Sequence, residues 1–88
     1  MDFEFDNKKS KANLVKHEID FVDGQRLWEN ETIEVLSAEK PEIRYLHVGK
    51  IDGKFWTAVI TYREQNIRII SIRRARKEER KVYEKNVK

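Results

Sequence analysis

Arginine is concentrated in one short stretch of this 88-residue chain, where an apolar run passes directly into a run of charge. The stretch reads IRIISIRRARKEER and contains Arg68, Arg73 and Arg74. A guanidinium group binds phosphate through two parallel hydrogen bonds, so arginines on a rigid element suit a phosphate-rich ligand. A solvated helix face is the alternative explanation for the last part of the run, because Glu78 and Glu79 can pair with basic residues one helical turn away.

Four further basic residues are candidates for the same chemistry. Arg63 ends the preceding apolar run, Arg44 begins another, and Lys16 with His17 closes the first predicted helix. Such a set, with aromatic rings among it, can bind single-stranded RNA. It can also cleave RNA without a metal, a reaction that needs a base near the 2′-oxygen, an acid near the 5′-oxygen and cations around the phosphate. The alternatives are surface ion pairs and helix-end contacts.

Other kinds of site find no support in the sequence. The chain has no cysteine, and His17 and His47 stand far apart and outside any spaced set of metal ligands. Its three glycines form no phosphate-binding loop, and no Ser-His-Asp arrangement follows from the spacing. We therefore expect neither a metal nor a cofactor. Tyr45 and His47 share a face of their predicted strand and could line a pocket or be ordinary half-exposed residues.

Length and composition predict one domain over residues 1–88. Charged residues make up 40% of the chain, above the roughly 25% of an average domain. The apolar fraction of 39% and the clear periodicity nevertheless favour a folded chain over a disordered one. No apolar run approaches the roughly 18 residues that cross a membrane, and the first residues do not resemble a signal peptide. We expect a soluble protein of the cytoplasm.

Charge is unevenly distributed along the chain. Residues 1–44 hold 7 Lys/Arg and 11 Asp/Glu, a net charge of −4, whereas residues 45–88 hold 12 and 5, a net charge of +7. This polarity favours an anionic partner on one side of the molecule, although the two halves could also complement each other within the fold.

The periodicity of apolar residues predicts an α+β fold. Phe3 and Phe5 alternate in a short first strand, and Asp6 caps a helix over residues 7–18 that turns Ala12 and Val15 inward. Asp20 caps a second, shorter helix within residues 21–30. Strands are predicted over residues 32–38, 43–51, 54–63 and 67–75, and a terminal helix over residues 76–88.

The strands predict one curved antiparallel meander of three to four strands, covered by one layer of helices. Asp52-Gly53 is a strong signal for a hairpin turn. Strict alternation along the last strand would place Arg68 and Arg74 on one face with Ile70 and Ile72, and Arg73 on the other.

Two parts of the chain resemble the BrnT-type toxins. FEFDNKKSKANLVKHEIDF is similar to the beginning of that family, with its F-x-W/F-D, its Asn and its Lys-His pair. HVGKIDGKFWTAVITYREQNIRIISIRRARKEERKVYE resembles the C-terminal half, with a T-x-R strand end, the run I-R-I-I-S-x-R-R-A and a final Tyr-Glu. The resemblance covers about residues 3–22 and 44–84, and the combination of the two parts is specific.

The resemblance implies a ribonuclease toxin of a type II toxin–antitoxin pair, with a compact fold related to RelE-like toxins. It also implies a BrnA-type antitoxin partner whose ribbon-helix-helix portion binds operator DNA, so that the toxin meets DNA only through its antitoxin. The function we expect is that of an endoribonuclease, which cleaves RNA without a metal and thereby arrests growth. The alternatives are a nucleic-acid-binding module without activity and a subunit that binds only the antitoxin.

Residues of the family motifs carry the expected roles. Lys16, His17 and Arg63 are the expected catalytic residues, with His17 as the proton carrier. The expected phosphate-binding residues are Arg68, Arg73 and Arg74 from these motifs, together with Arg44, which is not one of the motif residues. One of Arg73 and Arg74 should instead pair with an acid such as Glu78. Tyr83 is expected to pack in the core with its hydroxyl bonded.

Two departures from the family pattern concern turns. Glu18 stands where the family usually has glycine, so the end of the first helix could differ in shape. The EQN sequence after Arg63 replaces a turn that contains glycine, which could shift that side chain.

Overall fold

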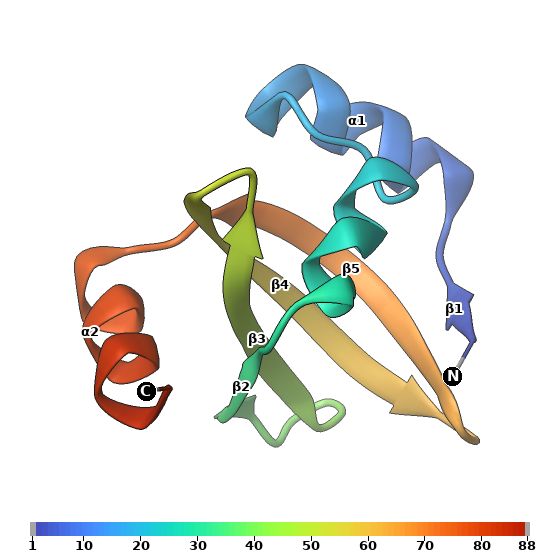
Figure 1. The fold of residues 1–88 in the computed structure, drawn as a ribbon. Helices are drawn as coiled ribbons and strands as arrows, with labels where there is room; N and C mark the ends of the chain where they lie inside the picture. Colours follow the sequence, from blue (N-terminus) through green and yellow to red (C-terminus); the bar gives the residue numbers. More distant parts are fainter. Residues whose placement is uncertain (1, 88) are drawn as a thin grey trace.

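The computed structural model describes residues 2–87 and shows an α+β fold (Figure 1). The elements follow one another as β1 (Phe3–Glu4), α1 (Asn7–His17), the 3₁₀ helix η1 (Asp23–Glu29), β2 (Ile33–Ala38), β3 (Arg44–Ile51), β4 (Lys54–Arg63), β5 (Asn66–Arg74) and α2 (Lys77–Asn86). The two predicted turns flanking β4 are present, and β2 to β5 lie close to their predicted ranges.

The sheet has five strands in the order β1-β5-β4-β3-β2. Strands β2 to β5 form the predicted antiparallel meander, but β1 pairs in parallel with β5, Phe3 opposite Ile67 and Glu4 opposite Arg68. The prediction of a meander of three to four antiparallel strands is therefore confirmed for β2 to β5, but it did not include β1 as a fifth strand of the sheet, paired in parallel. A two-residue strand gives too short a pattern to show where it pairs.

Local signals in the sequence explain how two of the elements begin and end. The carboxylate of Asp6 accepts hydrogen bonds from the backbone N–H groups of Lys8 and Lys9, which confirms it as the cap of α1. Asp52 and Gly53 both have positive φ angles, of 51° and 77°, as the tight hairpin between β3 and β4 requires.

The main core lies between one face of the sheet and the segment from Ile19 to Leu27. Ala58 and Ile60 of β4 face Ile72 and Ile69 of β5 on this side of the sheet, which we call the core face. Phe21 and Leu27 pack against these residues and are fully buried. Burial of this apolar surface is the main favourable term in the stability of so small a domain.

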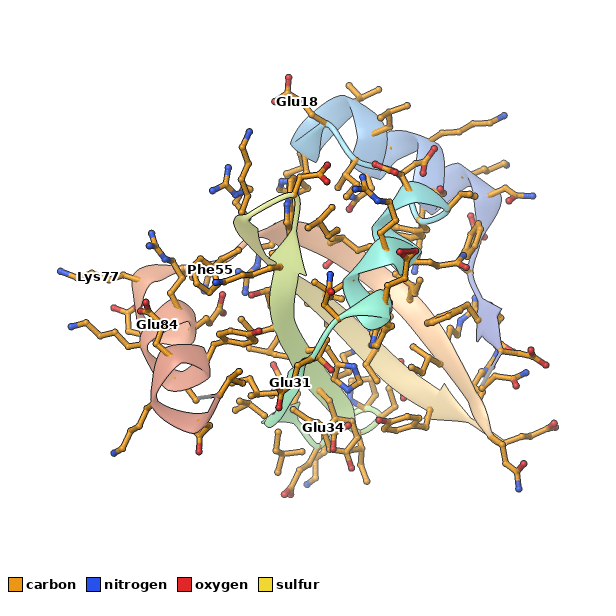
Figure 2. The ribbon with its side chains drawn as sticks, in the orientation of Figure 1. Glu18, Glu31, Glu34, Phe55, Lys77 and Glu84 are labelled. Carbon is orange, nitrogen blue, oxygen red and sulfur yellow. The ribbon has the colours of Figure 1, made fainter. Side chains whose placement is uncertain are left out.

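Helix α2 packs on the opposite face of the sheet, so the prediction of one helical layer was wrong. The side chain of Thr57 points to that face, and it donates a hydrogen bond to Glu79 of α2. Phe55 points toward α2 (Figure 2), and its ring meets the ring of Tyr83 at a centroid distance of 5.5 Å. Tyr83 is buried and its hydroxyl donates to the carbonyl of Glu31, which confirms its predicted place in the core.

Helix α1 is attached through polar side chains, whereas the apolar spacing predicted Ala12 and Val15 on its inner face. Val15 is 86% exposed, and the buried residues of α1 are Ser10 and Asn13. The Asn13 side chain donates to the carbonyl of Ile72 and accepts from the N–H of the same residue. Strand β1 pairs with only two residues of β5, so the rest of that edge has no neighbouring strand. The amide of Asn13 satisfies the backbone groups of Ile72 on this edge in place of a strand.

The second predicted helix is present, but as 3₁₀ helix rather than α-helix. Asp20, the predicted cap, accepts hydrogen bonds from the N–H groups of Val22 and Asp23 at the turn into η1, whereas the N-cap residue is Val22 and makes no side-chain cap bond. Gly24 allows η1 to approach the sheet closely, because a Cβ at this position would lie 2.1 Å from Cδ1 of Ile72. A residue that weakens an isolated helix is therefore required here by packing.

Glu18 ends α1 in the left-handed conformation, with φ 64° and ψ 23°, as glycine would. Its side chain lies at the end of the helix, away from the sheet (Figure 2). We expect Glu18→Gly to raise the free energy of unfolding by about 1 kcal/mol, because glycine adopts this conformation without steric cost. Urea denaturation measures the change, with Glu78→Gly inside α2 as the control that should lose stability. A less stable Glu18→Gly variant would contradict this prediction.

Candidate functional site

Strand β5 contains a bulge that decides which face each arginine occupies. Ser71 pairs with Val59 and Ile69 pairs with Ile60, which leaves Ile70 as the extra residue. The bulge reverses the alternation, so Arg68 and Arg73 lie on the same face of the sheet. The prediction that Arg68 shares a face with Arg74, opposite Arg73, was therefore wrong.

A row of polar side chains crosses the sheet on the face opposite the main core. Thr61 of β4 pairs with Arg68 of β5, which pairs with Glu4 of β1. In the antiparallel pair of β3 and β4, Tyr45 lies opposite Ile60. Arg44, one position earlier, therefore lies opposite Thr61, so that Thr61 has Arg44 on one side and Arg68 on the other. We call this side of the sheet the arginine face. It carries four of the predicted site residues, which are Arg44, Arg63, Arg68 and Arg73.

Arg63 and Arg68 converge on one carboxylate. Oε1 of Glu4 lies 3.2 Å from Nη1 of Arg68 and 3.7 Å from Nη1 of Arg63. Its other oxygen lies 3.5 Å from Nδ2 of Asn66, the residue paired with Arg63. The Arg63 side chain is 60% exposed and that of Arg68 is 30% exposed, so solvent reaches both guanidinium groups.

Arg44 stands at the other end of the row. Its Nε lies 3.5 Å from a carboxylate oxygen of Glu42 and is a buried donor that reaches no acceptor at hydrogen-bonding geometry within residues 2–87. Between Arg44 and Arg68, Thr61 is buried and donates its hydroxyl proton to the carbonyl of Ile43. The backbones of Arg44 and Arg68 therefore lie about 10 Å apart, two strand spacings, and both arginines are carried by the same sheet.

The middle of the arginine face is only partly covered. Helix α2 covers the end at which Val48 and Thr57 are fully buried. Leu46, Val59 and Ser71, which lie between that end and the row, keep intermediate exposure. A ligand can therefore reach the row and the apolar strip beside it.

Arg73 forms an ion pair with Glu79 of α2. Its two terminal nitrogens each lie 2.8 Å from an oxygen of Glu79, and the side chains are 19% and 13% exposed. Hydrogen bonds from Arg73, the backbone of Arg76 and the hydroxyl of Thr57 outweigh burial and lower the pKa of Glu79 to about 2. The acid that pairs is Glu79 and not Glu78, which the sequence suggested. This pair attaches α2 to the sheet.

Arg74 lies on the core-face side at the very end of β5. Its guanidinium stands 5.4 Å from the ring of Trp56, and its Nε donates to the carbonyl of Phe55. Arg74 is exposed and has the freedom to contact a ligand, but it does not join the row that contains Arg68.

The structure does not bring Lys16 and His17 to the arginine face. They end α1, which is held to the sheet near Ile72, whereas Arg63 pairs with Asn66 at the beginning of β5. Figure 1 shows the end of α1 and the arrowhead of β4 on opposite sides of the molecule. Lys16 is exposed and His17 half-buried, so both can meet a ligand, but at a separate place.

A second polar group, which the sequence did not reveal as a unit, lies at the edge of the core face. Trp28 donates from Nε1 to Nδ1 of His47 at 2.8 Å, and Nε2 of His47 lies 2.8 Å from Oε2 of Glu34. Since the indole can only donate, His47 carries its proton on Nε2 and donates to Glu34. The hydroxyl of Tyr62 donates to the same oxygen of Glu34. Tyr45 adds its ring to that of Tyr62, at a centroid distance of 5.5 Å.

This group connects the edge strand β2 to β3, β4 and η1. Burial raises the pKa of Tyr62 to about 12, with a further contribution from its hydrogen bond to Glu34. Burial opposes ionisation of Glu34, but the hydrogen bonds from Tyr62 and His47 outweigh it and lower the pKa of Glu34. The ring nitrogens of His47 are both bonded, so the group fixes the position of β2 and leaves no free imidazole for proton transfer.

Neither a membrane-spanning helix nor a metal-binding cluster occurs in the described part of the chain. Its helices are too short and too polar to cross a bilayer. Over residues 2–87, His, Asp and Glu side chains do not gather in groups of three or more that could hold a metal ion.

The fold and the arginine face define a small α+β domain with a rigid surface suited to a polyanion. Residues 5–79 match the family model described as the ribonuclease toxin BrnT of type II toxin–antitoxin systems. The chain therefore belongs to the BrnT family, as the motifs in its sequence indicated. A comparison with curated proteins found no match. Membership in the family implies a ribonuclease toxin, with RNA as its substrate and an antitoxin as its partner.

Proposed function

We propose that this chain is a metal-independent endoribonuclease that binds the scissile phosphate of single-stranded RNA on the arginine face. The observation that carries the proposal is the placement of Arg44, Arg63 and Arg68, from three strands, on one partly open side of the sheet. Preorganised guanidinium groups stabilise the extra negative charge of a pentavalent phosphorus without having to reorganise. The family description supports ribonuclease activity, and the row supports this way of achieving it.

The other predicted site residues have separate roles in this proposal. Arg73 supports the site by holding α2 through Glu79. Arg74, Lys16 and His17 contact RNA beyond the scissile nucleotide, since they lie outside the row. A role for His17 as the proton carrier would require the scissile phosphate to bind at the end of α1 instead. The rate of RNA cleavage by His17→Ala separates the two possibilities.

The proposed partner is a BrnA-type antitoxin whose ribbon-helix-helix portion binds operator DNA. Type II antitoxins are proteins, and the family description supports such a partner in general terms. In this proposal the toxin acts in the cytoplasm, contacts DNA only through the antitoxin and has a fold related to that of RelE-like toxins.

Purified protein incubated with single-stranded RNA in excess EDTA tests the proposed activity. We expect the RNA to be cut internally, at a rate that added Mg²⁺ does not raise, because guanidinium groups supply the positive charge. Gel electrophoresis of end-labelled RNA measures the fragments. RNA that is bound but intact would instead show a nucleic-acid-binding module. Absence of RNA binding, together with tight binding of the antitoxin, would show a subunit that only binds its partner.

A further inference from the structure

The arginine face supplies cations for phosphate, but cleavage through the 2′-oxygen also needs a base. The row and its neighbours contain one carboxylate in contact with two arginines, and that carboxylate belongs to Glu4. Thr61 is unsuited to the role, because its hydroxyl is buried and bonded to a backbone carbonyl. Glu42, the carboxylate near Arg44, meets only the Nε of that residue, at 3.5 Å.

The contacts of Glu4 hold its carboxylate in place and leave it accessible. Arg68, Arg63 and Asn66 surround it at 3.2, 3.7 and 3.5 Å, while the side chain remains 33% exposed. The two arginines share Oε1, whereas the hydrogen-bond partner of Oε2 among residues 2–87 is the amide of Asn66 at 3.5 Å. Oε2 therefore keeps the capacity to accept a hydrogen bond from a ligand.

The local charge allows a phosphate to bind beside this carboxylate. Glu4 with Arg63 and Arg68 carries a net charge of +1, and Arg44 with its neighbour Glu42 leaves this net charge at +1. A phosphodiester with one negative charge is therefore attracted to the row despite the carboxylate. When the arginines bind the phosphate oxygens, the adjacent 2′-hydroxyl would lie within reach of Glu4.

We infer that Glu4 is the general base of the ribonuclease reaction, an inference that rests on the proposed function. Glu4 takes the proton of the 2′-hydroxyl as the 2′-oxygen forms a bond to phosphorus and the bond from phosphorus to the 5′-oxygen breaks. The leaving 5′-oxygen takes a proton from water, and Glu4 returns its own proton to the hydroxide that remains. The products are a 2′,3′-cyclic phosphate and a 5′-hydroxyl, with no change of oxidation state.

Glu4→Gln tests this assignment, because the amide keeps the size and one acceptor but cannot take a proton. We expect the single-turnover rate on a mixed-sequence RNA oligonucleotide to fall by at least ~10²-fold, the usual contribution of a general base. The Kd for a 2′-O-methyl RNA of the same sequence, which cannot be cleaved, should stay the same or fall. If Glu4 only positioned Arg63 and Arg68, rate and affinity would decline together.

Two variants and the product ends complete the experiment. Asp23→Asn, which alters an exposed carboxylate beside Arg26, is the matched control and should cleave normally. The assignment is overturned if Glu4→Gln cleaves within about threefold of wild type, or if Glu42→Gln loses the activity instead. Products with a 3′-hydroxyl and a 5′-phosphate would also overturn it, while leaving the proposed ribonuclease intact. A wild-type protein that leaves RNA uncut would overturn both.

Discussion

Replacing Arg63 and Arg68 together by alanine is expected to reduce RNA cleavage by at least about 10³-fold and to end growth arrest when the chain is expressed alone. Both side chains reach the same part of the arginine face, where they contact Glu4 at 3.7 and 3.2 Å. Loss of one preorganised donor to a developing oxyanion costs about 10²–10³-fold in other enzymes. The rate of cleavage of end-labelled RNA, with thermal unfolding as a check of folding, measures the effect.

A matched variant separates loss of the site from loss of charge. Lys11→Ala with Lys85→Ala removes two exposed positive charges from the helices and should retain most of the cleavage rate. Arg68→Lys refines the comparison, because lysine keeps the charge but loses the planar pair of donors. It should bind RNA with a similar salt dependence and cleave it more slowly. Full activity of the double alanine variant, with the fold intact, would remove the arginine face from the mechanism.

The parts of the fold that the sequence predicted are those determined by neighbouring residues. Asp6 caps α1, and Asp52-Gly53 forms the hairpin, because each acts on backbone groups two or three positions away. The parallel pairing of β1 depends instead on contacts between Glu4 and Arg68, which are 64 residues apart. Periodicity contains no information about such a distance.

One extra residue in β5 explains why the arrangement of the arginines was mispredicted. A strand reverses its faces when its register shifts by a single position, and Ile70 provides that shift. Isoleucines stand at both odd and even positions of this strand, at 67, 69, 70 and 72, so the sequence does not show where alternation breaks. Arg68 and Arg73 consequently share a face, yet Arg73 is used for the ion pair with Glu79.

The sequence indicated the arginines of the site but not the carboxylates around them. Arg63 and Arg68 belong to motifs with a recognisable composition, whereas Glu4 is an ordinary acidic residue in a short strand. Its proposed role follows only from the place where β1 pairs. The same reason applies to Glu34, which meets His47 and Tyr62 from separate strands. Charge pairs formed across a sheet require knowledge of the pairing itself.

Glu79→Gln is expected to lower the free energy of unfolding by about 3 kcal/mol at neutral pH. The carboxylate has a pKa of about 2 in the folded protein, against an ordinary value of 4.5. Its ionised form is therefore stabilised by folding, and the variant also leaves the guanidinium of Arg73 without its charged partner. Urea denaturation at pH 7 measures the loss, with Glu78→Gln, the exposed neighbour, as the control that should change little.

The difference between wild type and Glu79→Gln should also depend on pH. A depressed folded pKa stabilises the protein fully above the unfolded pKa of 4.5, and this contribution is lost as pH falls toward about 2. Denaturation curves of the two proteins should therefore be well separated above pH 5 and approach each other between pH 4.5 and 2. A separation that stayed constant across this range would show that Glu79 contributes through packing and not through its charge. The attachment of α2 would then depend on the packing of Tyr83 against Phe55.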